Sequence, residues 1–312
     1  MDHFSALQAF AAVAEEGGFA PAARKAGLAT SSLTRQVDAL EDHLGTLLLN
    51  RSTRSVTLTP AGEDYLGQAV RILADLEEAN RNVSERDGPP RGILRISLPV
   101  VFARLHVTPI LPDFLRACPE IEIEILMTDR MVNLVEDRID VAIRLGMLDS
   151  SSLVARRLAP HHRRLCASPA YLAEHGRPQN PSDLTRHRCL TFSYGSADRT
   201  WRFARDGREE SVRVRGPLRA NDSETLKAAA LKGLGLLLMP TWLVGKELAD
   251  GTLCPVLPEW TAEVGRGAAS VQSDAGIFAL YLPDRKGSAK VRTFVDFLAA
   301  RFGAPPYWDE GQ

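Results

Sequence analysis

The sequence contains few of the features that mark disulfide-rich, metal-binding or thiol-based proteins. Its 312 residues include only four cysteines, Cys118, Cys166, Cys189 and Cys254. No two of them form a C-x-x-C pair or another zinc-type spacing. We therefore expect no metal and no cofactor. We interpret the cysteines as small apolar core residues in a reducing compartment, with a thiol redox sensor as the alternative.

Long apolar runs and an excess of charge are missing as well. No stretch reaches the ~18 consecutive apolar residues of a membrane span. Glu15 and Glu16 lie where a signal peptide would be cleaved. The net charge is −1, so only local clustering of charge can indicate a polyanionic partner. We predict a cytoplasmic protein with no membrane association.

Motifs that mark enzymes are absent too. The sequence has no G-x-S-x-G elbow, no phosphate-binding G-x-x-x-x-G-K-S/T loop and no H-E-x-x-H pair. Gly233-x-Gly235 lacks the third glycine of a dinucleotide-binding turn. His161 and His162 are adjacent, and neighbours on a strand point to opposite faces, so we interpret them as part of a polar loop. No catalytic residue and no metal ligand is predicted.

The first 60 residues have the periodicity of three short helices followed by a hairpin. The first helix ends at Gly17-Gly18, and the second begins at Pro21 and ends at Gly27. The third helix carries one apolar stripe, formed by Leu33, Val37, Leu40 and Leu44. The segment LLLNRSTRSVTLT then predicts two strands around a polar tip, Asn50 to Ser55.

Helix, glycine turn, helix and basic hairpin together fit winged helix-turn-helix geometry. The alternative is a small structural or protein-interaction domain. Ser31 and Arg35 lie opposite the apolar stripe, where a third helix would meet the major groove of double-stranded DNA. We predict DNA contacts from the start of this helix and from the wing, through Thr30, Ser31, Ser32, Thr34, Arg35, Arg51 and Arg54.

A long helix is predicted from Pro60 to about Arg86, where apolar residues alternate at spacings of three and four. This a/d pattern predicts pairing with a second copy of the helix, and the alternative is a helix packed on its own domain. The predicted dimerisation seam consists of Leu66, Ala69, Leu73, Leu76, Asn80 and Val83. A Gly- and Pro-containing segment, 87–92, then ends the helix and supplies a hinge.

From Ile93 onward strands alternate with helices, which predicts parallel sheets in two α/β lobes. Helices are expected over LHVTPILPDFLRAC (105–118) and MVNLVED (131–137), among others. Residues 303–312 begin with Ala-Pro-Pro and are interpreted as a loose tail. The predicted division is a DNA-binding domain (1–59), a linker helix (60–87), a first lobe (91–162 and 266–302), a second lobe (163–265) and the tail.

In open α/β sheets, ligands bind in the crevice beyond the carboxyl ends of the strands. Loops after four predicted strands and before one helix meet this description. We predict that a small-molecule effector binds between the lobes, next to Pro99, Val100, Val101, Phe102, Arg144, Leu145, Gly146, Ser193, Tyr194, Asn221, Asp222, Met239 and Pro240.

The run GGFAPAARKAGLATSSLTRQVDALEDHLGTLLLNRSTRSVTLTPAGEDYL resembles the winged helix-turn-helix of LysR-type transcriptional regulators. It contains their F-x-x-A-A, S/T-R-Q-I/V, L-E-x-x-L-G and L-T-x-A-G elements in order. Ala29 departs from the family, whose members usually have a capping serine there, and we expect Thr30 to cap the helix instead. The segments PEIEIEI, DRIDVAIRLG and KAAALKGLGLLLMP resemble the effector domain of the same family.

This resemblance implies a multidomain protein in which a winged helix-turn-helix and linker helix precede a two-lobed α/β effector domain like the periplasmic binding proteins. It implies a homodimer or homotetramer whose effector changes its binding to DNA, with RNA polymerase as a further candidate partner. Relatives often carry a hydroxyl near position 101. Val101 has no hydroxyl at this position, which favours an aromatic or apolar effector.

Two alternatives to this function remain open from the residues. One is an enzyme or solute-binding protein of α/β fold with an appended helical domain, because a fold does not determine a function. The other is a winged-helix regulator that needs no ligand.

Overall fold

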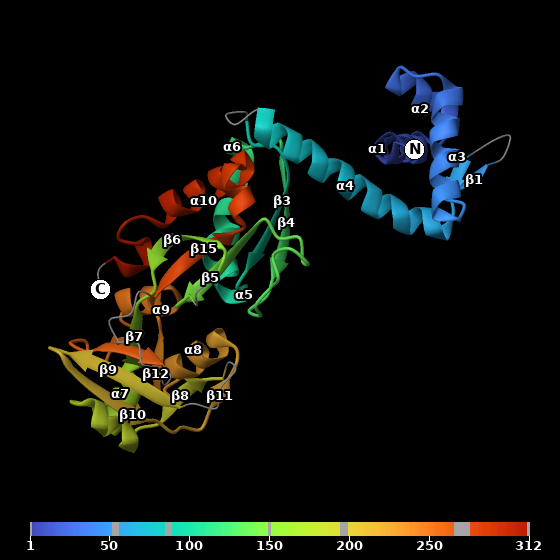
Figure 1. The fold of residues 1–312 in the computed structure, drawn as a ribbon. Helices are drawn as coiled ribbons and strands as arrows, with labels where there is room; N and C mark the ends of the chain where they lie inside the picture. The colour runs from blue at the N-terminus through green and yellow to red at the C-terminus, as the bar shows by residue number, and fades with distance from the viewer. Residues whose placement is uncertain are drawn as a thin grey trace. The chain divides into compact units, whose positions relative to one another are not determined.

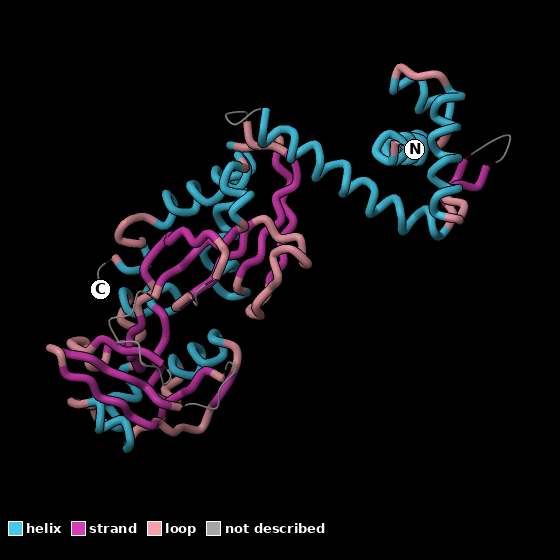
Figure 2. Tube along the Cα trace, viewed as in Figure 1, coloured by secondary structure: helices cyan, strands magenta, loops and turns pink. Residues whose placement is uncertain are grey.

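The computed structural model describes residues 2–51, 56–84, 89–148, 151–193, 199–264 and 275–310, with side chains for all of these except 74, 75 and 77–84. The chain divides into two compact units, Met1–Asp87 and Gly88–Gln312 (Figure 1). In Figure 2 the first unit is almost entirely helical, whereas strands and helices alternate along the second. This confirms the predicted fold class.

The first unit contains three short helices, a hairpin and a long helix, as predicted. The elements are α1 (His3–Glu16), α2 (Phe19–Ala26), α3 (Thr30–Leu44), β1 (Leu49–Arg51), β2 (Val56–Leu58) and α4 (Pro60–Ser84). The first three helices all end at a glycine with a φ of 66°: Gly17, Gly27 and Gly45. Glycine adopts this left-handed conformation without a steric penalty, which is why the glycine positions predicted the helix ends correctly.

Three local predictions in this unit are wrong. The second helix starts at Phe19, so Pro21 lies within its first turn instead of opening it. Leu44 is 37% exposed at the end of α3, and Glu41 is buried instead because it accepts hydrogen bonds from the start of β1. Thr30 is the first helical residue, and the N-cap Ala29 provides no side-chain hydrogen bond.

The L-T-x-A-G element joins the hairpin to α4. The Thr59 side chain accepts a hydrogen bond from the Gly62 backbone N–H at 3.0 Å and donates to the Leu47 carbonyl at 2.8 Å. A Cβ on Gly62 would lie 2.0 Å from the Leu48 carbonyl oxygen. Only glycine allows α4 to approach the hairpin this closely.

The first three seam residues of α4 pack within their own unit. Ala69 is buried, and Leu66 and Leu73 pack partly buried against the same core. The alternative of a helix packed on its own domain therefore holds for this half of α4. By contrast, Leu76 is 37% exposed. Asn80 and Val83 lie outside the described side chains.

The second unit is built on two five-stranded sheets and one three-stranded sheet. The first-lobe sheet has the order β4 (Ile121–Met127), β3 (Gly92–Leu98), β5 (Val141–Gly146), β15 (Gly276–Tyr281), β6 (Val154–Pro160). The second-lobe sheet has the order β11 (Arg219–Ala220), β8 (Cys189–Phe192), β12 (Leu236–Pro240), β7 (Arg163–Ala167), β13 (Cys254–Pro255). The three-stranded sheet has the order β10 (Arg208–Arg213), β9 (Thr200–Arg205), β14 (Thr261–Val264).

Parallel pairing was predicted for strands that are joined by a crossover connection, and it is present in both five-stranded sheets. β3 is parallel to β4 and β5, and β8 is parallel to β11 and β12. The remaining pairs in these two sheets are antiparallel: β15 with β5 and β6, and β7 with β12 and β13. The α-helices of this unit are α5 (Val100–Phe102), α6 (Leu111–Ala117), α7 (Pro169–His175), α8 (Ser223–Leu231), α9 (Thr241–Ala249) and α10 (Ala289–Phe302).

Two predicted helices of the first lobe differ in the structure. The segment 131–137 forms turns, because the Asn133 side chain accepts the backbone N–H groups of Val135 and Glu136 and so competes with helix formation. The helix expected over 105–118 is interrupted around Pro109, whereas Pro112 lies in the first turn of α6. A π-helical turn, η1 (Ala103–Val107), and a 3₁₀ turn, η2 (Thr108–Ile110), precede α6 there. Further 3₁₀ turns are η3 (Pro181–Arg186), η4 (Pro283–Gly287) and η5 (Tyr307–Asp309).

The C-terminal residues are not a loose tail. Trp308 is 6% exposed and contacts the rings of Phe102, His106 and Phe302. The Tyr307 hydroxyl lies 2.6 Å from His106 Nδ1. Composition suggested a tail because Ala-Pro-Pro follows the end of α10. Tyr307 and Trp308 come next, and they bring the chain back onto the core. The prediction is therefore wrong for residues 303–310.

Three of the four cysteines are buried, as predicted: Cys118, Cys166 and Cys189. Burial raises the pKa of Cys166 and of Cys189 to about 12. A buried thiol held protonated is a poor nucleophile, which disfavours a redox sensor at these two positions. Cys254 is half-buried. No helix in the described ranges has the length and apolar character needed to cross a membrane.

Candidate functional site

Helix α3 presents its first turns to solvent. Thr30, Ser31 and Arg35 are exposed, whereas Ser32 and Thr34 are half-buried. Thr34 donates its hydroxyl to the Thr30 carbonyl at 2.9 Å. Within the described part of the chain, Arg35 has no ion pair, so its guanidinium is available to an external anion. The predicted contacts on α3 thus share one accessible turn of helix.

The wing is held by a buried carboxylate. One oxygen of Glu41 accepts the backbone N–H groups of Leu48 and Leu49 at 2.8 and 3.0 Å, and the other binds the Arg51 guanidinium at 2.6 Å. Arg51 also pairs with Asp38 at 2.6 Å. Arg51 was expected at the wing tip, but it lies in β1 and joins the wing to α3. Arg54 lies outside the described residues.

A pocket of about 350 Å³ lies where the strand ends of the two lobes meet. Nine predicted effector residues line it: Pro99, Val100, Val101, Phe102, Leu145, Asn221, Asp222, Met239 and Pro240. The strand-end rule therefore selected residues that the fold brings together in one pocket. Tyr194 lies outside the described residues.

Three predicted effector residues do not line this pocket. The Arg144 guanidinium turns into the first lobe, where it donates to the Ser97 hydroxyl at 3.0 Å and to the Ile143 carbonyl. Gly146 pairs with Gly276 in the sheet, and the Ser193 backbone N–H donates to the Ala220 carbonyl. These residues follow strand ends, but their local hydrogen bonds direct them elsewhere.

Five lining residues were not predicted: Asp129, His161, Arg163, Phe192 and Trp242. Ser223 also lines the pocket, and it belongs to the same predicted loop as Asn221 and Asp222. Asp129 follows the end of β4 and satisfies the rule that was applied to the other strands. His161 and Arg163 lie where the chain passes from β6 of one lobe to β7 of the other. A segment that crosses from one lobe to the other borders the crevice. The predicted position of this crossing could therefore have identified His161 and Arg163.

The polar groups of the pocket wall are mostly neutral or compensated. His161 is 5% exposed, and burial lowers its pKa to about 3, so its imidazole is uncharged at neutral pH. His161 lies in the loop between β6 and β7, as interpreted, but its side chain is buried instead of facing solvent. Arg163 is paired with Glu263 at 3.3 Å. Asp222 caps α8 by accepting the Thr225 backbone N–H, and hydrogen bonds from Thr225 lower the pKa of its carboxyl group.

Two buried ring nitrogens in the pocket wall have no hydrogen-bond partner among the described residues. They are His161 Nδ1 and Trp242 Nε1. An unpaired buried donor or acceptor costs about 1–3 kcal/mol, and such groups are characteristic of sites that a ligand completes.

A neutral histidine links this wall to the C-terminal residues. The His106 ring contacts the Trp242 backbone carbonyl through Nε2 at 2.8 Å and the Tyr307 hydroxyl through Nδ1 at 2.6 Å. A carbonyl only accepts, so Nε2 carries the proton and Nδ1 accepts from Tyr307. Burial lowers the pKa of His106 to about 4, which keeps the ring neutral.

Comparison with known proteins identifies the class to which these two units belong. A family model described as the bacterial regulatory helix-turn-helix protein, lysR family, matches residues 4–63. A model described as the LysR substrate binding domain matches residues 87–303. The chain belongs to the LysR family of transcriptional regulators.

Full-length relatives agree with this assignment. The chain is 36% identical over 301 residues to the HTH-type transcriptional regulator PtxR of Pseudomonas aeruginosa, covering 96% of this chain and 93% of that protein. It is 33% identical over 300 residues to the HTH-type transcriptional regulator CrgA of Neisseria meningitidis, covering 95% and 96%. These relatives are DNA-binding regulators and not enzymes, so the alternative of an enzyme or solute-binding protein is wrong.

Solved structures have the same organisation. CrgA from Neisseria meningitidis matches with a TM-score of 0.59 and 32% identity, covering 95% of this chain and 97% of that chain. Full-length AphB from Vibrio cholerae matches with a TM-score of 0.57 and 29% identity, covering 95% and 98%. The protein is therefore a transcriptional regulator with a DNA-binding unit and an effector-binding unit.

Proposed function

We propose that this regulator responds to a small uncharged molecule, aromatic or otherwise apolar, that carries one hydroxyl or carbonyl group. The effector binds in the 350 Å³ pocket between the lobes, and its binding changes how the protein engages DNA. The observation that carries this proposal is the pair of unpartnered ring nitrogens in a mainly apolar wall.

The charges around the pocket favour a neutral ligand over an acid. The cation of the wall, Arg163, is already paired with Glu263. Asp129 and Asp222 contribute carboxylates, and His161 is neutral. A ligand carboxylate would add a further negative charge beside these carboxylates, which disfavours its binding. An oxygen on an uncharged ligand can instead accept from Trp242 Nε1, and a hydroxyl can pair with His161 Nδ1 as well.

Thermal-shift titrations of the full chain with benzyl alcohol and with benzoate test this proposal. The alcohol should raise the melting temperature more than the acid at equal concentration, because ligand binding to the native state stabilises by mass action. Val101→Trp should abolish the shift by filling the pocket. Val135→Trp is the matched control, since Val135 is 65% exposed elsewhere in the first lobe. A larger shift with benzoate would contradict the ligand class.

For DNA, we propose that Thr30, Ser31, Ser32, Thr34 and Arg35 meet the major groove. The exposed first turns of α3 and the unpaired Arg35 support this assignment. Arg51 is proposed to act on DNA binding by positioning the wing through Glu41 and Asp38. Arg54 remains a predicted contact of the wing.

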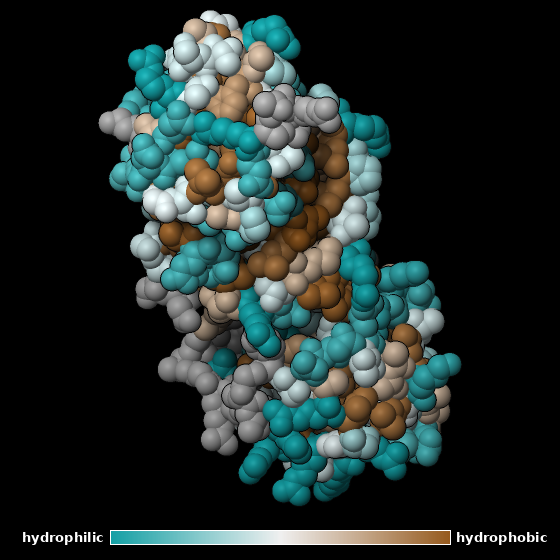
Figure 3. All heavy atoms as spheres, turned by 90° about the vertical axis from the view of Figure 1, so that its right-hand side faces the viewer, coloured by the Kyte–Doolittle hydropathy of each residue, from teal (hydrophilic) through white to brown (hydrophobic). Residues whose placement is uncertain are grey.

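We also propose a homodimer or homotetramer that uses α4, with RNA polymerase as a further partner at a promoter. The apolar residues available for self-association are Val70, Ile72 and Leu76, which are 51%, 52% and 37% exposed. Val70 lines a groove of about 740 Å³ formed with α1, α2 and α3. On the face of the molecule drawn in Figure 3, hydrophobic residues gather in a hollow bordered by hydrophilic ones.

A further inference from the structure

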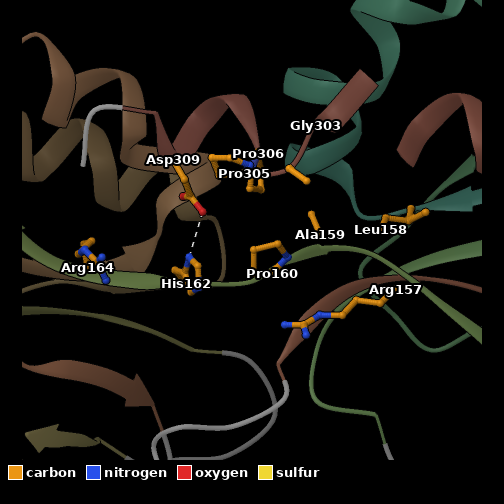
Figure 4. A pocket seen from close by; sticks show the side chains of 11 residues that line it. Arg157, Leu158, Ala159, Pro160, His162, Arg164, Gly303, Pro305, Pro306 and Asp309 are labelled. Atoms are coloured by element: carbon orange, nitrogen blue, oxygen red, sulfur yellow. Dashed lines mark hydrogen bonds and ion pairs between the residues drawn. The ribbon is translucent and has the colours of Figure 1, made fainter. Parts of the chain in front are cut away.

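A second pocket, of about 580 Å³, lies on the other side of the chain that connects the two lobes. Its wall is formed by the end of β6, the crossing from β6 to β7, and C-terminal residues 303–309 (Figure 4). The C-terminal residues close this pocket because Trp308 anchors them to the core. It is separate from the effector pocket and shares none of its lining residues.

The two pockets share a dividing wall, formed by the connection between β6 and β7 and by the start of β7. His161 and Arg163 line the effector pocket, whereas His162 and Arg164 line the second pocket. Alternation along an extended chain produces this arrangement, because neighbouring side chains point to opposite faces. The backbone of this wall is held on both sides: His161 N–H donates to the Ala275 carbonyl, and the His162 carbonyl accepts from Thr241 N–H. Adjacent residues therefore face two different sites.

Positive charge predominates in the second pocket. In Figure 4, Arg164 and Arg157 lie on either side of the pair formed by His162 and Asp309. The guanidinium of Arg157 donates to the Ala275 carbonyl, and that of Arg164 to the Arg163 carbonyl. Within the described ranges, neither guanidinium has a carboxylate within ion-pair distance. Two cations thus border one cavity, and its lining carboxylate, Asp309, pairs with His162 instead of with either arginine.

Asp309 adds a second requirement. Its Oδ2 atom lies 2.9 Å from His162 Nδ1, whereas its Oδ1 atom is buried with no partner among the described residues. A buried carboxylate oxygen needs a hydrogen-bond donor, and leaving it unpaired is costly. A ligand for this pocket should therefore offer a hydroxyl to Asp309 as well as an anionic group to the arginines.

We infer that the second pocket binds a small hydroxylated anion, a carboxylate or a phosphate ester, at a site independent of the effector pocket. The anionic group pairs with one of the two arginines, which lie at opposite ends of the pocket, since guanidinium groups bind carboxylate and phosphate oxygens with charge-assisted hydrogen bonds. The hydroxyl donates to Asp309 Oδ1. The bound anion contacts both the β6–β7 connection and the C-terminal residues. It thereby stabilises the arrangement that the effector domain has without its effector.

Calorimetric titration of the full chain tests this site with three probes that share a glyceryl group. Glycerol 3-phosphate and glycerate should bind, and glycerol should not. At least one of Arg157→Gln and Arg164→Gln should weaken anion binding by about 10- to 100-fold, the usual effect of losing a charged hydrogen bond. At the position that responds, Arg157→Lys or Arg164→Lys should retain more of the binding than the glutamine variant because it keeps the charge. Arg186→Gln, an exposed residue of the second lobe that does not line this pocket, is the matched control and should bind like wild type.

The same variants separate this inference from the proposed effector site. Arg157→Gln should leave the thermal shift with benzyl alcohol unchanged, because Arg157 does not line the effector pocket. Circular dichroism at 25 °C verifies that each variant is folded. The inference is overturned if neither anion binds wild type, if glycerol binds as tightly as the anions, or if both glutamine variants bind like the Arg186→Gln control.

Discussion

Trp308→Ala tests whether the C-terminal residues are part of the effector domain core. Trp308 is 6% exposed, and its ring lies in edge-to-face contact with three aromatic residues. The ring centroids are 6.0 Å from Phe102, 4.7 Å from His106 and 5.2 Å from Phe302. Phe102 also lines the effector pocket. Removing the indole therefore leaves a cavity beside the wall of the proposed ligand site.

The size of the effect follows from the buried ring. Truncating a buried tryptophan to alanine costs about 3–5 kcal/mol through lost burial and the cavity that remains. For a unit of this size that corresponds to a fall in melting temperature of about 6–20 °C. Trp308→Phe keeps an aromatic ring at this position and leaves a smaller cavity, so its cost should stay below about 1.5 kcal/mol.

Differential scanning calorimetry of the full chain measures both variants against wild type. The transition of the effector unit should move in Trp308→Ala and remain nearly in place in Trp308→Phe. The transition of the DNA-binding unit should be unchanged in both, because Trp308 belongs to the core of the second unit. A shift below about 2 °C in Trp308→Ala would mean that the C-terminal residues do not pack as described, and the reasoning would fail.

Three further predictions address DNA binding, assembly and pH. Arg35→Ala should weaken specific DNA binding by ~1 to 3 kcal/mol without changing stability, and equal affinity for the operator in gel-shift titrations would exclude a base contact. Leu76→Lys should shift the assembly toward monomer, because self-association through α4 would bury the lysine charge without a partner. If sedimentation shows the wild-type assembly, α4 associates through other residues. The folded-state pKa of His106, about 4, lies below the unfolded value of ~6.5, so its contribution to stability is complete above pH 6.5 and is lost as pH falls toward 4. His106→Gln should reduce the slope of unfolding free energy against pH by about 1.4 kcal/mol per unit in that window, and an unchanged slope in urea titrations would contradict a neutral buried ring.

The sequence by itself determined the order and type of most elements. Glycines that tolerate a φ of 66° ended α1, α2 and α3 where predicted, because this signal is local. The strand-end rule brought residues as distant as Val101 and Met239 to one pocket. They lie at strand ends of two different sheets, and the carboxyl ends of parallel strands in each sheet face the crevice between the lobes.

Tertiary structure alone decided the features that depend on contacts between distant segments. Leu66 and Ala69 fit a dimerisation seam by spacing, yet they complete the core of their own unit, and periodicity cannot tell which apolar surface a stripe will meet. Trp308 packs against Phe102, some two hundred residues away, although the Ala-Pro-Pro segment before it suggested a loose tail. His161 and His162 face different pockets because the chain crosses between lobes at that point. Their environments, and with them the lowered pKa of His161, arise from desolvation by the surrounding fold, which no local pattern encodes.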